Sequence, residues 1–181
     1  MLSRRTVLSA ALLGGASFAS LGVRAAPPAG GYKTITWDSL VPKDWNPNGM
    51  LKDAPPADLQ DNDPRAQAML DKLREAWDNA PTNNTMNNTK VRLPGYLVPL
   101  EQAESGQVSE FLLVPYFGAC IHTPPPPANQ IVHVLPRKPA KFKAMDAVWV
   151  SGTLQVSRNA SAMGTSGYRL EAVTVERYKP E

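Results

Sequence analysis

Residues 147–156 read AVWVSGTLQV, and their regular alternation of apolar and polar side chains is the clearest indication of fold class in the chain. Alternation with a period of two predicts a β-strand with one buried face. Gly152 interrupts the stretch and predicts a sharp bend. Residues 168–178 alternate in the same way, apart from a phase slip at 172–173 that predicts a β-bulge. We expect residues 160–167 (ASAMGTSG) to form a loop between these two strands.

Three further strands are predicted upstream, over residues 91–100, 109–114 and 130–135. Pro and Gly bend the first of them. Five short, bent strands predict a mainly β fold, namely a small OB-like five-stranded barrel, with an open β-sandwich as the alternative.

One N-terminal helix is predicted over residues 64–80, because Asp63 can cap it and Pro64 suits its first turn. Apolar side chains recur on one face of this helix at helical spacing. We expect this stripe to pack into the core; it comprises Ala66, Met69, Leu70, Leu73 and Trp77.

Composition excludes several classes of protein. The chain has 181 residues and 18 prolines, about twice the usual share of proline, which argues against an all-helical bundle. A single Cys and two His exclude an internal disulfide, a Cys-rich zinc finger and a Cys-ligated iron–sulfur cluster. No phosphate-binding glycine loop, no G-x-S-x-G elbow and no H-E-x-x-H motif occurs.

Residues 1–25 have the pattern of an export signal: a basic start, an uncharged apolar stretch and a small-x-small cleavage site at 23–25. The pair Arg4-Arg5 resembles a twin-arginine signal. We therefore expect a periplasmic protein, with an irregular segment over 26–63 that contains a short strand at 32–37, and a domain of helix plus barrel over 64–181. Without residues 1–25 the chain carries 16 basic and 16 acidic residues, so we expect no nucleic-acid partner and no stable membrane insertion.

The stretch PYFGACIHTPPPPANQ, residues 115–130, is the candidate functional segment. If its backbone is extended, the side chains of Cys120 and His122 point to one face and can share a metal ion. His133, which points away from Val132 and Val134, is the candidate third ligand. A thiolate with imidazoles suits zinc or copper, and a fourth ligand could be water, Glu110, Asp146 or a partner's residue.

The four prolines Pro124, Pro125, Pro126 and Pro127 predict a stiff polyproline segment beside this site. Asn129 and Gln130 can orient ligands through their amides. Three other interpretations stay open. Cys120 is either a buried structural thiol or, if it is a thiolate at neutral pH, the reactive group of a thiol enzyme. Alternatively, the proline run and the two amides dock a membrane partner without any metal.

Three segments resemble one family of exported bacterial proteins that is known only as a domain of unknown function: PGYLVPL (94–100), EFLLVPY (110–116) and GACIHTPPPPANQ (118–130). The resemblance extends over about residues 32–178. Some members are encoded beside ABC-type transporter components in clusters induced by zinc starvation. The resemblance therefore implies a periplasmic accessory protein linked to zinc supply. We expect a protein that is not an enzyme and that binds a transition metal, zinc above all, near Cys120 and His122.

Overall fold

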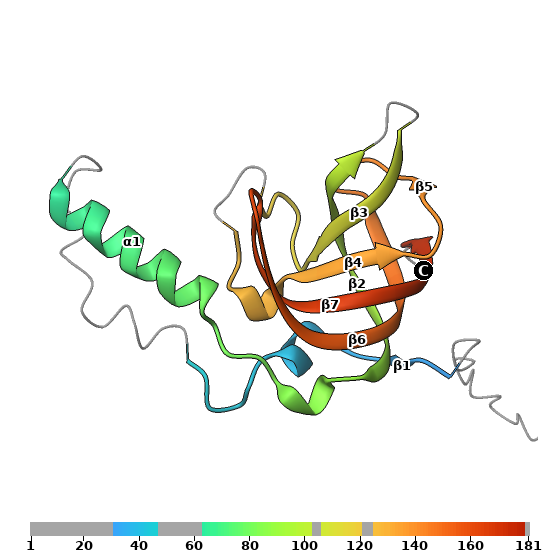
Figure 1. The fold of residues 1–181 in the computed structure, drawn as a ribbon, viewed down its shortest axis with the longest axis horizontal. Coiled ribbons are helices and arrows are strands. Elements are labelled where there is room, and N and C mark those ends of the chain that lie inside the picture. Colours follow the sequence, from blue (N-terminus) through green and yellow to red (C-terminus); the bar gives the residue numbers. More distant parts are fainter. Residues whose placement is uncertain (1–30, 47–62, 103–105, 121–124, 180–181) are drawn as a thin grey trace, which may run out of the picture.

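A computed structural model describes residues 31–46, 63–102, 106–120 and 125–179. The fold is mainly β, with one α-helix (Figure 1). The helix is α1 (Pro64–Asp78), and three 3-10 turns are η1 (Trp37–Leu40), η3 (Asn84–Met86) and η4 (Ala128–Gln130). The strands are β1 (Lys33–Thr34), β2 (Thr89–Gln102), β3 (Gln107–Val114), β4 (Val132–Pro136), β5 (Ala140–Lys141), β6 (Ala147–Ser161) and β7 (Gly164–Arg177).

All seven strands belong to one mixed sheet in the order β1-β2-β6-β7-β4-β3-β5. An additional pairing of β2 with β3 closes five of them, β2, β3, β4, β7 and β6, into a ring of hydrogen-bonded strands. Within this ring only β4 and β7 pair in parallel. Figure 1 shows these strands curling around a common interior, with the β6–β7 hairpin bent over one side.

The long strand β2 pairs with two different strands along its length. Residues 89–96 pair with β6, and residues 96–102 pair with β3. The register of β2 against β3 shifts between Pro99 and Glu101, which confirms the predicted irregularity in this strand.

The two strands that alternate most clearly in sequence form the long antiparallel β6–β7 pair. Gly152 and Ala172 are register partners, as are Ser151 and Thr174, so Val173 is the extra residue of a bulge at the predicted phase slip. A Cβ atom on Gly152 would overlap the carbonyl of Glu171, which explains the glycine. The expected loop over 160–167 is wrong: β6 continues to Ser161, and β7 begins at Gly164.

The interior of the ring is apolar. Cross-strand partners share a face, and the pairs that meet inside include Leu93 with Val150 and Leu154 with Leu170. Tyr168 is also fully buried there, and its hydroxyl donates to the Leu40 carbonyl and accepts from the Asn83 N–H, each at 2.6 Å. These bonds attach η1 and η3 to one end of the ring.

A second, smaller cluster of buried side chains lies on the opposite face of β2 and β3. We call it the outer cluster; it comprises Val98, Leu112, Val114, Ala119 and Ile131. Val98 and Leu112 are register partners, and both strands thus contribute to two cores. The segment that follows β3 covers this face.

The predicted start of the helix is confirmed, but the predicted packing of its apolar stripe into the core is wrong. The Asp63 side chain caps α1 by accepting from the Arg65 N–H at 2.8 Å, and Pro64 occupies the first turn. However, no residue of α1 is buried, and Leu70 is 51% exposed. Figure 1 shows α1 extending beyond the sheet rather than lying across it. Within the described residues, no helix is long and apolar enough to cross a membrane.

Candidate functional site

Cys120 lies in a turn that follows β3, on the outer cluster. Its φ angle is 66°, a left-handed backbone, so the extended conformation assumed for this position is wrong. The thiol is half-buried against the outer cluster, where Met145 and Met163 also pack. Burial raises the pKa of this thiol to about 11, which keeps it protonated at neutral pH.

The turn around Cys120 is tied to a second strained position. The Gly118 N–H donates to the Met145 Sδ at 3.1 Å, and Met145 itself has a φ of 65°. A long side chain at positive φ is uncommon and requires support from its surroundings. Burial, followed by the proximity of Cys120, raises the pKa of the neighbouring Tyr116 hydroxyl. A thiol, a thioether and a phenol therefore gather at this turn.

His133 is the second predicted site residue that the structure describes. It is 7% exposed, and its ring lies on the face opposite Val132 and Val134, as expected from the alternation. Its Nε2 lies 2.5 Å from the Glu110 Oε1, and its Nδ1 lies 3.2 Å from the Asn159 Nδ2. Since an amide nitrogen donates, Nδ1 accepts and Nε2–H donates to the carboxylate. Both ring nitrogens are thus engaged by protein groups.

The predicted metal donors are only partly brought together. Cys120 packs on the cluster that contains Leu112, and Leu112 is the register partner of His133, so thiol and imidazole share a face of the sheet. Glu110 lies beside His133, whereas Asp146 pairs with Arg177 at 2.7 Å. His122 lies outside the described residues. Within the described part, no three His, Cys, Asp or Glu side chains form a group that could hold a metal ion.

The two amides of the candidate segment serve as structural ties. Asn129 is fully buried, and its Nδ2 donates to the Pro81 carbonyl at 2.9 Å. Gln130 donates to the Trp37 carbonyl at 3.1 Å. These bonds attach η4 to the segments on either side of α1, while the Oδ1 of Asn129 is buried without a hydrogen-bond partner among the described residues.

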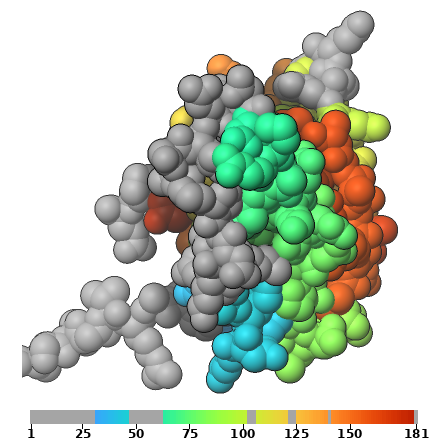
Figure 2. Space-filling model, turned by 90° about the vertical axis from the view of Figure 1, so that its left-hand side faces the viewer, coloured from blue at the N-terminus to red at the C-terminus, as the bar shows by residue number. Residues whose placement is uncertain are grey.

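The proline run lies against the helix. Pro125 and Pro126 line a hollow of about 250 Å³ together with the apolar stripe of α1, which we call the α1–proline groove. Its remaining lining residues are Leu70, Leu73, Arg74, Trp77 and Asp78. Figure 2 shows α1 lying at the surface of the molecule on this side. Pro127 precedes η4, and Pro124 lies outside the described residues.

The sequence predicted Cys120, His133 and Glu110 as candidates, but it missed Asn159 and Met145. Asn159 sits in β6 close to the hairpin turn, 26 residues from His133, and no local pattern links the two. Met145 follows the sheet edge in a segment without periodicity. The exposed Phe117, 66% accessible and edge-on to Tyr96 at 5.7 Å, was also not singled out, although it lies within the candidate segment.

Comparison with known proteins supports a single assignment. No curated protein matches the chain. A crystal structure of a DUF3299 family protein from Pseudomonas aeruginosa PAO1 is similar, with 39% sequence identity and a TM-score of 0.65 over 84% of this chain and 99% of that one. A small single-stranded DNA-binding protein from Streptomyces coelicolor matches with 14% identity and a TM-score of 0.30, over 51% of this chain and 95% of its own, which is too distant to carry an argument.

The family model of DUF3299, described as a protein of unknown function, matches residues 37–177. This range includes α1, η4 and all strands of the sheet except β1. The chain therefore belongs to the DUF3299 family.

Proposed function

We propose that the protein is a periplasmic accessory protein of an envelope transport system and that it docks on its membrane partner through the α1–proline groove. The observation that carries this proposal is the incomplete burial of the apolar stripe of α1, in which Leu70 is exposed and Leu73 and Trp77 are only partly buried. The proposal keeps the predicted docking role of the proline run and restricts it to Pro125 and Pro126, which line the groove.

Energetics favour a covered groove. A helix of 15 residues is marginal in water on its own and is normally stabilised by packing of its apolar face. Burying a Leu side chain completely contributes about 1.5–3 kcal/mol, so an apolar segment of a partner that covers Leu70 and Leu73 stabilises both the helix and the complex. Arg74 and Asp78 at the rim offer one charge of each sign for orientation.

Cross-linked capture from bacterial envelopes tests this role. Leu70→Gln removes apolar contact at a position that is already half-exposed, so the variant folds. Lys72→Gln is the matched control, because Lys72 is exposed on the same helix and does not line the groove. We expect the unaltered protein and Lys72→Gln to capture an identified ABC-type transporter component that Leu70→Gln loses. Retention of that component by Leu70→Gln refutes docking through the groove.

A second candidate function is binding of a transition metal, zinc or copper, at the Cys120 turn. Soft sulfur donors favour it, since Cys120 and Met145 pack on one cluster and His133 lies on the same face. The described donors alone do not fit a complete site: a metal ion has to displace the thiol proton and to replace Glu110 or Asn159 on His133. The site therefore depends on His122.

Metal titration with elemental analysis tests this second role. We expect loading of the unaltered protein with zinc or copper(I) to fall by about one equivalent in Cys120→Ser and in His122→Ala. Equal loading of the three proteins refutes a metal site at this turn. Because Leu70→Gln leaves the Cys120 turn intact, each of the two proposed functions can be refuted without affecting the other.

We also infer that the ring of strands is an OB-type barrel. The order β2-β3-β4-β7-β6 with a single parallel pair, β4 with β7, supports this topology. An experimental structure in which the β2–β3 pairing is open would contradict it.

A further inference from the structure

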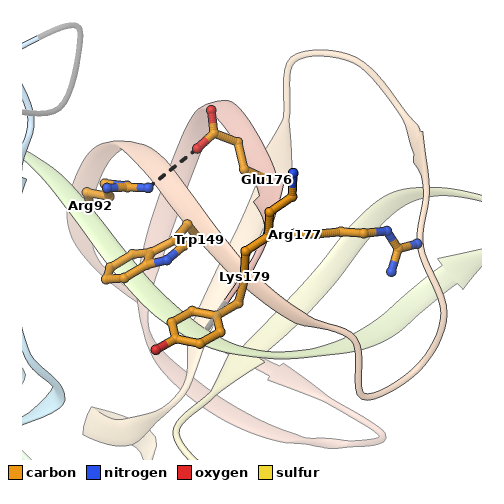
Figure 3. A pocket seen from close by; sticks show the side chains of 6 residues that line it. Arg92, Trp149, Glu176, Arg177 and Lys179 are labelled. Carbon is orange, nitrogen blue, oxygen red and sulfur yellow. Dashed lines mark ion pairs between the residues drawn. The ribbon is translucent and has the colours of Figure 1, made fainter. Parts of the chain in front are cut away.

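A second hollow lies far from the groove in sequence, where β2, β6 and β7 present one outer surface. Its volume is about 760 Å³, which is within the range of small-molecule sites. Figure 3 shows its side chains; the lining residues are Arg92, Trp149, Glu176, Arg177, Tyr178 and Lys179. None of them belongs to the candidate segment at 115–130.

Flat side chains form one wall of this hollow. The rings of Trp149 and Tyr178 are stacked, with centroids 5.8 Å apart and planes at 26°. The Arg92 guanidinium lies 4.3 Å from the centre of the Trp149 ring (Figure 3). The result is a row of three planar groups in which Trp149 lies between Arg92 and Tyr178, and Tyr178 at the end of the row is 44% exposed.

The main chain holds this row in place. Trp149 pairs in register with Pro94 of β2 and with Glu176 of β7, so its ring stands between both neighbouring strands. The Tyr178 N–H donates to the Ala147 carbonyl at 2.8 Å, which anchors the residue directly after β7. The wall is therefore preorganised, and a ligand does not need to order it.

The charges of the hollow do not balance. Arg177 pairs with Asp146 at 2.7 Å, and Arg92 lies 3.5 Å from Glu176. Within the described residues, Lys179 has no carboxylate partner. Figure 3 shows the Arg177 side chain directed away from Trp149, which leaves Arg92 and Lys179 as the cations beside the aromatic wall. Among the described residues, Lys179 is thus a positive charge without a paired carboxylate beside a stacking surface, which favours a ligand with one acidic group and a flat ring.

We propose that this hollow is a binding site for planar anions, in which the ring of the ligand stacks on Tyr178 and its acidic group contacts Lys179. The ligand is a small molecule, because the even balance of charges outside residues 1–25 provides no extended basic surface for a polyanion. A carboxylate and a phosphate on the ring can each pair with this one cation.

The site can be tested by NMR titration of the full chain, with the indole N–H of Trp149 as the reporter. The probes are benzoate and uridine 5′-monophosphate, which combine a flat ring with a carboxylate or a phosphate. Their controls are cyclohexanecarboxylate, with the same charge and no flat ring, and inorganic phosphate. We expect at least one ring probe to saturate the Trp149 signal in the millimolar range and to bind about tenfold more tightly than its control. The ring probe that binds more tightly identifies the preferred acid.

Variants of exposed residues separate binding from folding. We expect Tyr178→Leu to raise the dissociation constant of the ring probe about tenfold, since a stacked aromatic contact is lost. Lys179→Ala should lower the affinity for the ring probe several-fold and make that affinity less dependent on salt. Lys72→Ala on α1 should leave the affinity unchanged. The proposal is overturned if neither ring probe saturates the signal below about 10 mM. It is also overturned if cyclohexanecarboxylate binds as tightly as benzoate and inorganic phosphate as tightly as the nucleotide. The third contradicting result is an unchanged dissociation constant in both Tyr178→Leu and Lys179→Ala.

Discussion

Alkylation of Cys120 by iodoacetamide provides a direct measure of the state of the thiol. The chain has a single Cys, so the reaction reports one site. Burial raises the pKa of Cys120 from an ordinary value of 9.0 to about 11. At pH 8 the thiolate fraction then falls from about 9% to about 0.1%, roughly a hundredfold. A more basic thiolate is also more nucleophilic, and two pKa units restore about tenfold in rate. The net expectation is alkylation about tenfold slower in the folded protein than in urea, before any steric protection.

The dependence on pH is more diagnostic than the rate itself. The thiolate becomes populated only near pH 11, so the folded-state rate should rise about tenfold per pH unit from pH 7 to pH 10 without levelling. In urea the same rate should level above pH 9. The assay is mass spectrometry of the intact protein after timed quenching, with Cys120→Ser as the background control and circular dichroism to confirm folding at each pH. A folded-state rate that levels below pH 9 would falsify a desolvated thiol and would favour a reactive thiolate.

The remaining predictions concern stability, measured by urea unfolding. Gly152→Ala should cost about 2–4 kcal/mol, because the new Cβ overlaps the carbonyl of Glu171 and the backbone of two strands has to separate; an unchanged midpoint would contradict the tight β6–β7 approach. Glu110→Ala should cost about 1–3 kcal/mol, because it leaves the buried imidazole N–H of His133 without an acceptor, and a neutral result would mean that this pair is not formed. Tyr168→Phe should cost about 2 kcal/mol, because two buried main-chain groups lose their partner; a loss below half of that would show that water replaces the hydroxyl.

Local periodicity predicted most of the sheet. The stretches at 91–100, 109–114, 130–135, 147–156 and 168–178 all lie mostly within strands, and the bulge at Val173 was readable as a slip in alternation. The hairpin turn at 162–163 was predicted as a longer loop over 160–167, because its flanking residues are small and polar, which is also the composition of loops. The two-residue strand β5 carries no periodic signal at all.

Periodicity could not show what covers a face. The stripe on α1 indicated an apolar surface, but nothing in its spacing distinguishes packing against the ring from exposure at a groove. The same limit applies to the site. Alternation placed His133 opposite Val132 correctly, yet its partner Asn159 comes from a distant hairpin. For Cys120 the extended backbone was a poor assumption, because the turn through Gly118 reverses the chain before it.

The single parallel pair in the ring has a consequence for how the chain acquires its structure. Strand β7 pairs with β6 on one side and with β4 on the other, so neither seam exists until the last strand has been synthesised. The β6–β7 pairing is a local hairpin, whereas the parallel β4–β7 pairing joins residues that are distant in sequence and therefore forms slowly. Until then β4 and β6 present unpaired edges, which invite association with other chains. A nascent or truncated chain that ends before residue 164 should therefore be a substrate for chaperones and prone to aggregation.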